Sequence, residues 1–394
     1  MKKIAERVFL ALSALAVLGT LGLLALGVGQ NVSYFENRAL ANVPEASADS
    51  ILSGRWFNEW DTWYMDHLKG RTALLKLNTA LDLFLYDRPV VNDQIVSSDV
   101  LLIENSYNVW DDSYLAEDSR EMAAHWKVLS DHVESFGGSF CFLGLPYQTV
   151  YFYQHYPSYL ADGHWYSEDC RAALFSALAD ADVTAVDMTA VYESMGYPAE
   201  FYSAVDHHYT FAGALTAYRE LMEVLRETTG LDLTVLSEDD LEITTLPNPY
   251  LGSSLRKLYG LWPSDERVQV GFPVNETPFT RIDNGTASQN TLFTLPATDT
   301  EYVTYNIYMG GDVAETIIDT GRDDLPKLLL FGDSFTNPLE TLLYASFGES
   351  RYLDLRYYSE QSLLDYIADY QPDVVVCVRD STMYYSTAGN GNYN

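Results

Sequence analysis

A serine and a histidine that lie far apart in the chain have the neighbours that nucleophilic catalysis requires. Ser334 stands in Gly332-Asp333-Ser334-Phe335, between the apolar run Lys327 to Phe331 and a helix that we expect to open at Pro338. A serine after a buried strand lies at the edge where open α/β sheets bind ligands, and backbone N–H groups there can stabilise an oxyanion. The pattern favours a nucleophile at Ser334, with an ordinary Gly-Asp-Ser turn as the alternative.

The expected acid–base partners lie in Asp206-His207-His208-Tyr209. A serine hydroxyl needs an imidazole to accept its proton and a carboxylate to orient that imidazole. Asp206 and His208 are two residues apart, so an extended segment turns both to one side and His207 to the other. We therefore predict His208 as the base and Asp206 as its orienting acid. The alternatives are a solvated loop or a metal-binding pair.

A metal site is the less favoured alternative. Neighbouring histidines on opposite sides of a strand chelate poorly, and no H-E-x-x-H or C-x-x-C spacing is present. We therefore predict no metal and no cofactor. The three cysteines allow one disulfide at most, and each lies in an apolar or helical run that favours burial.

Two further residues are weaker candidates for the same site. Arg356 follows an expected strand at 352–355, where it could bind an anionic sugar or polarise an acyl oxygen; a surface ion pair is the alternative. Asn337 could donate a hydrogen bond to an oxyanion, although capping of the following helix is the favoured role. Asp333 is expected to fix the turn by accepting local N–H groups.

The elements that must position these residues alternate between strand and helix. Near-continuous apolar runs predict strands at 100–103, 139–145, 183–186, 327–331, 352–355 and 373–378, and amphipathic stretches predict helices near 114–136, 168–181, 211–228, 338–347 and 360–369. Such alternation indicates an α/β fold with a parallel sheet covered on both faces. We predict a helical lead-in over 31–90, interrupted at Lys69-Gly70-Arg71, and a catalytic domain over 91–394. Prolines, Asn-Gly and Thr-rich segments make 229–324 an irregular insertion with short antiparallel strands.

The first thirty residues and the overall charge indicate where the protein acts. An apolar run from Val8 to Val28 follows Lys2, Lys3 and Arg7, which predicts a membrane anchor at 1–30 with the remainder exported; a cleaved secretory signal is the alternative. The formal net charge is −33, so the chain repels phosphate backbones and nucleic-acid binding is excluded.

The two motifs, taken with several shorter blocks, resemble a known family. Besides Gly332 to Phe335 and Asp206 to Tyr209, the blocks are Glu36-Asn37-Arg38-Ala39-Leu40, Ser53-Gly54-Arg55-Trp56, Asp66-His67-x-x-Gly70-Arg71, Tyr250-Leu251-Gly252-Ser253, Gly310-Gly311-Asp312 and Asp354-Leu355-Arg356-Tyr357-Tyr358. In this order they resemble the DHHW family of SGNH-hydrolase-like proteins, which are related to proteins that O-acetylate alginate. The chain departs from the family pattern at Tyr209, where a tryptophan is expected.

The resemblance implies a fold and a function. It implies a flavodoxin-like three-layer α/β/α fold of the SGNH type, with Ser334, His208 and Asp206 as a catalytic triad and Tyr209 as an aromatic contact for an acceptor sugar. We expect an exported O-acetyltransferase that acts on a polysaccharide through an acetyl-enzyme intermediate. Because acetyl-CoA is absent outside the cell, a multi-pass membrane acyltransferase is the expected acetyl donor. A carbohydrate acetyl-esterase with the same triad and a noncatalytic glycan-binding assembly protein are the alternatives.

Overall fold

The structure is a computed structural model that describes residues 7–15, 18–19, 22, 31–104, 112–160 and 164–387. The chain divides into two compact units, Met1–Gln94 with Leu255–Pro263, and Ile95–Ser254 with Ser264–Asn394. Residues 16–17, 20–21 and 23–28 of the predicted anchor from Val8 to Val28 lie outside the described residues. Among the residues that the structure describes, no helix has both the length and the apolar character needed to cross a bilayer.

Residues 7–15 of the first unit are helical, and its described part beyond residue 30 holds a short hairpin followed by the helices α2, α3 and α4. Its elements are β1 (Val32–Ser33), β2 (Arg38–Ala39), α2 (Ala48–Leu52), α3 (Arg55–His67), α4 (Arg71–Phe84) and β3 (Val90–Val91). The predicted break between α3 and α4 is confirmed, because Gly70 has a φ of 85° and caps α4 in the left-handed conformation that glycine favours.

Two ion pairs join the hairpin to the helices of this unit. Arg38 donates to both carboxylate oxygens of Asp66 at 2.6 and 2.8 Å, and Arg71 binds both oxygens of Glu36. Asp66 also accepts the Ala41 N–H at 2.9 Å, and the hydrogen bonds from Arg38 contribute most to lowering the pKa of Asp66 to about 2. The sequence block Glu36 to Leu40 thus binds the block Asp66 to Arg71 through paired charges.

An eight-stranded sheet forms the centre of the second unit, in the order β11-β10-β12-β14-β13-β15-β6-β7. The strands are β6 (Ser139–Leu145), β7 (Ala185–Asp187), β10 (Thr280–Asp283), β11 (Thr286–Ala287), β12 (Glu315–Asp319), β13 (Leu328–Gly332), β14 (Glu349–Asp354) and β15 (Val374–Asp380). The five from β14 to β7 are parallel. Across the sheet these five strands follow one another as β14, β13, β15, β6 and β7. If β13 is numbered 1, β14 is 2, β15 is 3, and β6 and β7, which come earlier in the chain, are 4 and 5. The spatial order is then 2-1-3-4-5, as in a flavodoxin-like sheet.

The prediction of a parallel sheet is wrong for one part of it. β10, β11 and β12 all come from the predicted insertion 229–324, and they extend the sheet in antiparallel fashion from the edge of β14. An added strand satisfies the hydrogen-bonding groups that an edge strand leaves open. The insertion also forms the antiparallel pair β8 (Leu241–Thr245) and β9 (Gln269–Pro273). The strand predicted at 100–103 forms as β5 (Leu101–Ile103), near β4 (Gln94–Val96), but is not one of the eight.

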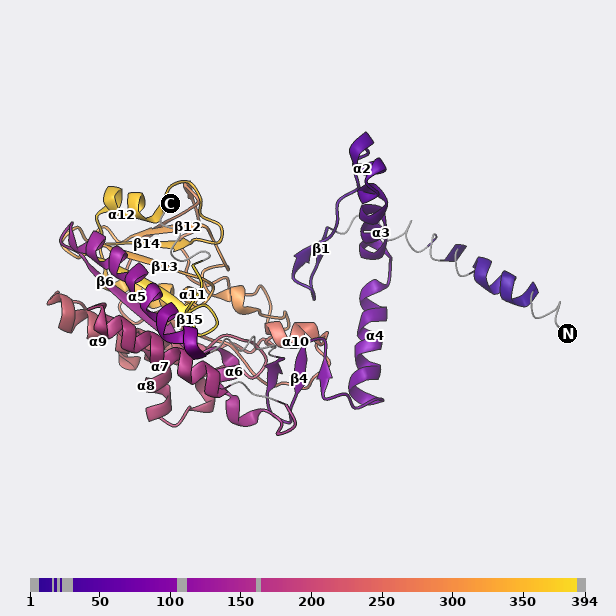
Figure 1. The fold of residues 1–394 in the computed structure, drawn as a ribbon, viewed down its shortest axis with the longest axis horizontal. Helices are drawn as coiled ribbons and strands as arrows, with labels where there is room; N and C mark the ends of the chain where they lie inside the picture. Colours follow the sequence, from indigo (N-terminus) through magenta and orange to yellow (C-terminus); the bar gives the residue numbers. More distant parts are fainter. Residues whose placement is uncertain are drawn as a thin grey trace. The chain divides into compact units, whose positions relative to one another are not determined.

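Helices cover this sheet (Figure 1). α5 (Asp112–Glu134), α7 (His164–Asp180) and α12 (Leu363–Tyr370) share one apolar core with β6, β13 and β15, centred on the buried Trp126. α9 (Phe211–Thr229) packs on α11 (Thr336–Leu343) and contacts β6 and β7. Every residue of β13 and β15 is buried, as expected of strands covered on both faces. The three cysteines are buried, so their predicted burial is confirmed.

The remaining helices are short. They are α6 (Gln148–Tyr151), α8 (Met188–Ser194), α10 (Ser253–Lys257) and the 3₁₀ helices Tyr153–His155, Ala199–Phe201, Glu238–Asp240, Tyr305–Ile307 and Tyr344–Ser346. α10 and the 3₁₀ helix at Tyr305 belong to the insertion, and both adjoin the site described next.

Candidate active site

Ser334 lies at the point where the order of the parallel strands reverses. β13 ends at Gly332 and α11 begins at Thr336, so Ser334 occupies the turn at the carboxyl end of the strand. A Cβ atom on Gly332 would approach Thr336 Cγ2 to 2.4 Å, so only glycine permits this tight strand-to-helix turn. Asp333 fixes the turn as predicted, because its carboxylate accepts the Phe335 N–H at 3.0 Å and faces Arg379 at 3.3 Å.

Ser334, His208 and Asp206 form one continuous chain of hydrogen bonds. His208 Nε2 lies 2.7 Å from Ser334 Oγ, and His208 Nδ1 lies 2.6 Å from Asp206 Oδ1. The backbone N–H of His208 also donates to Asp206 Oδ1 at 3.2 Å. Asp206 and His208 are buried, whereas Ser334 is partly exposed. With a proton on Nδ1, the imidazole can accept the serine proton at Nε2.

The orientation predicted for His207 is wrong. The segment that carries these residues is bent rather than extended, and the rings of His207 and His208 lie 3.7 Å apart. His207 Nδ1 is 2.8 Å from Ser253 Oγ and 3.3 Å from Asp206 Oδ1. The alternation of side chains that holds for a strand does not hold for a bend, because the backbone turns between the two residues.

This bend brings three metal-ligand types together. Atoms of Asp206, His207 and His208 that could bind a metal all lie within 4.8 Å of one another. However, both ring nitrogens of His208 already take part in hydrogen bonds, to Asp206 and to Ser334. A metal bound at His208 would therefore replace the chain of hydrogen bonds that reaches Ser334.

Two residues of the insertion complete the site, and sequence reasoning missed both. The Ser253 N–H donates to Asp206 Oδ2 at 2.6 Å, and the ring of Tyr305 stacks on the His208 ring at 3.6 Å with an interplanar angle of 6°. Gly252 permits the first contact, because a Cβ there would lie 2.3 Å from the Val205 carbonyl oxygen. The Gly252-Ser253 pair was a detectable signal, whereas nothing in the sequence around Tyr305 distinguishes it from the other tyrosines.

The surroundings of Asp206 keep its carboxyl group ionised. Burial by itself would raise the pKa of Asp206, but the charges and hydrogen bonds of His208 and His207 and the N–H of Ser253 favour the charged form. Together they hold the pKa of Asp206 well below its usual range. An ionised Asp206 can stabilise the imidazolium that forms when His208 takes up a proton.

The weaker candidates lie around a neighbouring carboxylate rather than on the triad. Asn337 Nδ2 donates to Asp312 Oδ1 at 3.2 Å, and Arg356 Nη2 contacts Asp312 Oδ2 at 2.9 Å. Arg356 is also paired with Asp354 at 2.6 Å, which agrees with the ion-pair alternative. Asn337 lies within the first turn of α11 and is not its cap; the capping alternative is wrong, because the cap position is Phe335.

Tyr209 lies in the protein interior, next to the loop that carries Ser334. Its side chain is buried, and its hydroxyl donates to the Phe335 carbonyl oxygen, next to Ser334. Its ring stacks on that of Phe335 with a centroid separation of 5.5 Å. In this position Tyr209 helps to hold the loop that carries Ser334.

Comparison with known proteins supports the fold. No protein-family model and no curated protein matches the chain. Two structures of Bacillus cereus PatB1, one with a sulfonyl adduct, are 20% identical to it, cover 75% and 76% of this chain and 96% and 99% of their own, and have TM-scores of 0.63 and 0.65. A DHHW family protein from Eubacterium siraeum is 19% identical over 77% of this chain and 97% of its own, with a TM-score of 0.55. The predicted resemblance to DHHW proteins is thus confirmed at the level of the fold.

Proposed function

We propose that this protein is a polysaccharide O-acetyltransferase that works through an acetyl ester of Ser334. The observation that carries the proposal is the unbroken chain from Ser334 through His208 to Asp206, with contacts of 2.7 and 2.6 Å. Three residues in this arrangement activate a serine for acyl transfer.

The first half of the reaction transfers an acetyl group to the protein. Ser334 Oγ attacks the carbonyl carbon of an acetyl ester while its proton passes to His208 Nε2. The tetrahedral intermediate then collapses, the bond to the donor oxygen breaks, and that oxygen leaves with the proton from His208. The product is acetyl-Ser334 and the deacetylated donor. Asp206 stabilises the imidazolium throughout this half.

The second half regenerates the serine. His208 takes the proton of a sugar hydroxyl, whose oxygen attacks the acetyl carbonyl carbon. Collapse breaks the bond to Ser334 Oγ, which recovers the proton from His208, and an O-acetyl sugar leaves. Water in place of the sugar would release acetic acid, so the same residues serve hydrolysis.

The polymeric acceptor and the cellular setting belong to the same proposal. Ser334 is partly exposed at the edge of the sheet, where a hydroxyl of a long chain can reach it without entering the interior. The apolar run of residues 8–28 supports export and attachment to the membrane. Outside the cell, an acyl-carrying membrane protein would supply the acetyl ester.

The test uses a chromogenic acetyl ester with purified protein, with and without oligosaccharide acceptors. We expect release of the chromophore to be faster with an acceptor present and to yield an acetylated sugar, detected by mass spectrometry. Ser334→Ala should abolish both. Acetate without acetylated sugar, for every acceptor tried, would identify an esterase instead.

A sulfonyl fluoride gives a second readout that needs no acceptor. One of the PatB1 structures carries a sulfonyl adduct, and an activated serine attacks this class of reagent. We expect one adduct on Ser334, located by peptide mass spectrometry. A wild type that is inert to both reagents, like Ser334→Ala, would contradict the enzymatic proposal.

A further inference from the structure

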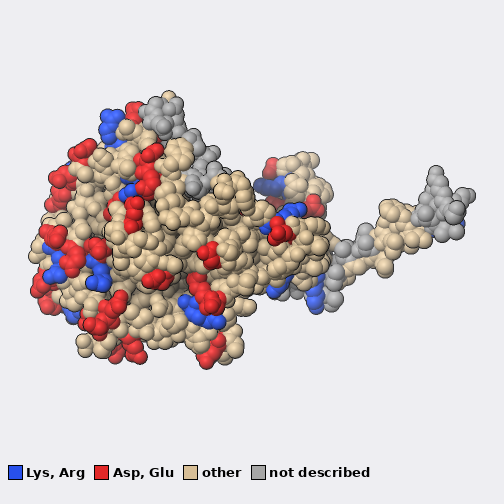
Figure 2. All heavy atoms as spheres, turned by 90° about the horizontal axis from the view of Figure 1, so that it is seen from below, with Lys and Arg blue, Asp and Glu red and all other residues tan. Residues whose placement is uncertain are grey.

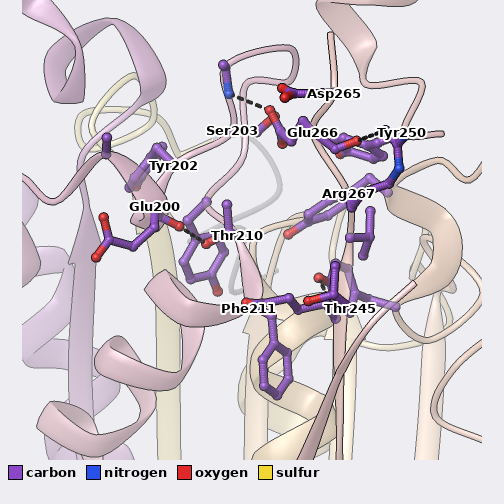
Figure 3. Close-up of a pocket in the computed structure, with 17 residues that line it drawn as sticks. Glu200, Tyr202, Ser203, Thr210, Phe211, Thr245, Tyr250, Asp265, Glu266 and Arg267 are labelled. Atoms are coloured by element: carbon purple, nitrogen blue, oxygen red, sulfur yellow. Dashed lines mark hydrogen bonds between the residues drawn. The ribbon is translucent and has the colours of Figure 1, made fainter. Parts of the chain in front are cut away.

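A cavity of about 440 Å³ lies beside the triad, and Ser334 is not among its lining residues. Figure 3 shows Glu200 and Tyr202 on one side of it and Tyr250 and Arg267 on the other. The buried part of its lining, called the floor below, includes five tyrosines: Tyr202, Tyr209, Tyr250, Tyr305 and Tyr308. Exposed side chains form its rim, among them Glu200, Thr245 and Asp265. The volume lies within the range of small-molecule sites, roughly 300–1,000 Å³.

One hydroxyl on this floor lacks a partner. The hydroxyls of Tyr202 and Tyr209 donate to the carbonyl oxygens of Pro146 and Phe335, and that of Tyr308 donates to the Gln269 carbonyl oxygen at 2.9 Å. The Tyr305 hydroxyl is buried and forms no hydrogen bond within the part of the chain that the structure describes. A buried hydroxyl without a partner is costly, and an acceptor atom of a bound molecule would satisfy it.

The charges around the cavity favour a ligand that is not an anion. Glu200, Asp265 and Glu266 line it, against one cation, Arg267. Two nitrogens of Arg267 already donate to the carbonyl oxygens of Pro247 and Glu266. Glu266 accepts the Ala204 N–H at 2.9 Å, and burial raises the pKa of Glu266 to about 7. Near neutral pH this carboxyl group can therefore either accept or donate a hydrogen bond.

A sugar ring has the properties that the lining of this cavity favours. Its C–H groups pack on aromatic carbon, and its hydroxyls exchange hydrogen bonds with phenol and carboxyl groups. We propose that this cavity binds a single sugar residue that is neutral or carries an amine, with one of its oxygens accepting a hydrogen bond from Tyr305. A uronic acid is disfavoured because its carboxylate would meet the acidic lining.

This site goes beyond the acetyl transfer proposed above and does not depend on it. The cavity adjoins the triad through Tyr305, which lines the cavity and whose ring stacks on His208. Binding can be measured in Ser334→Ala, so a failure here and a failure of the catalytic proposal are separate results.

The test measures binding of D-glucosamine, D-glucose and D-glucuronate to the full-length Ser334→Ala protein by ligand-observed NMR. We expect glucosamine and glucose to bind and glucuronate to bind at least about tenfold more weakly. Adding Tyr305→Phe, which keeps the ring but removes the free hydroxyl, should weaken binding about three- to tenfold, the usual effect of one lost hydrogen bond. Thr245→Trp, at the exposed rim, should block binding.

Tyr308→Phe is the matched control. It removes a hydroxyl from the same floor, but one that already bonds to a carbonyl oxygen, so it should lower the melting temperature and leave sugar affinity unchanged. Tyr305→Phe should not lower the melting temperature, because it removes an unsatisfied group. Absence of binding by any of the sugars, binding led by glucuronate, or equal effects of the two variants on affinity would overturn the proposal.

Discussion

At the scale of single residues, the site depends on how each nitrogen of one imidazole is used. His208 Nδ1 faces Asp206 and Nε2 faces Ser334, so the carboxylate fixes the tautomer that leaves Nε2 free to accept a proton. Tyr305 holds the ring from the side through stacking. These contacts thus restrain both the position and the tautomer of the histidine.

Asp206→Asn tests that arrangement. An amide fills the same space but stabilises the imidazolium poorly and can donate to Nδ1, which favours the wrong tautomer. We expect kcat for a chromogenic acetyl ester to fall on the order of 10³–10⁴-fold with little change in melting temperature. Asp312→Asn changes a carboxylate outside the triad that binds Asn337 and Arg356; it is the control, and its kcat should fall far less. Comparable losses in the two variants would contradict the role given to Asp206.

At the scale of elements, the insertion reaches back to support the triad. The first residue of α10, Ser253, presents its N–H to Asp206 Oδ2 at 2.6 Å, while its hydroxyl contacts His207. The backbone donor and the side chain therefore have separate partners. Of the two groups, only the backbone donor touches the Asp206 carboxylate.

Ser253→Pro and Ser253→Ala separate these contacts. Proline suits the first position of a helix but removes both the N–H and the hydroxyl, whereas alanine removes only the hydroxyl, so the difference between the two variants measures the N–H contact. We expect kcat to fall about tenfold or more in Ser253→Pro, as for a lost hydrogen bond to a charged group, and to change little in Ser253→Ala. Circular dichroism and melting temperature check that both variants fold. A larger loss in Ser253→Ala would assign the effect to His207 instead.

The helix that follows Ser334 carries a buried acid. Glu340 lies on α11, accepts the Thr336 hydroxyl at 2.5 Å, and has its pKa raised to about 8 by burial. In the unfolded chain its pKa would be about 4.3. Between these values the folded state keeps a proton that the unfolded state has lost, so stability falls as the pH rises.

Glu340→Gln should remove this dependence. We expect the wild type to lose on the order of a few kcal/mol of unfolding free energy between pH 5 and pH 9 beyond what the variant loses. Urea unfolding at several pH values measures the difference. If the unfolding free energy of Glu340→Gln changes with pH as much as that of the wild type, the Glu340 carboxyl group is not the one that titrates.

At the scale of the whole molecule, negative charge dominates. The formal net charge is −33, and Figure 2 shows Asp and Glu side chains spread over the visible face, with fewer Lys and Arg among them. Exposed like charges repel each other and oppose compaction. Within the first unit, the opposite charges of Arg38 and Asp66, and of Arg71 and Glu36, attract each other and favour compaction.

Salt should therefore stabilise the protein. Raising NaCl from 20 to 200 mM shortens the screening length and weakens repulsion more than it weakens the half-buried pairs. We expect the melting temperature at pH 7.5 to rise by roughly 2–4 °C, measured by differential scanning calorimetry. Near the isoelectric point, about 4.3, the same salt increase should have a much smaller effect. A melting temperature that falls with salt at pH 7.5 would show that attractive pairs outweigh the repulsion.

The sequence by itself determined the local elements and the chemistry of the two motifs. Apolar runs correspond to β6, β13 and β15, because a strand buried on both faces needs an unbroken series of apolar side chains. Ser334 at the end of β13 and Asp206 two residues before His208 were likewise readable, since each depends only on near neighbours.

Only the tertiary structure decided which distant residues meet. Ser334 and His208 are 126 residues apart, and their contact depends on the order in which the strands assemble. The same holds for Ser253 and Tyr305, which the folded insertion brings to Asp206 and His208, and for the bend that turns His207 to the side of His208. Side-chain patterns record the burial of a residue but not its partner, because many apolar or polar neighbours satisfy the same pattern and the path of the chain selects among them.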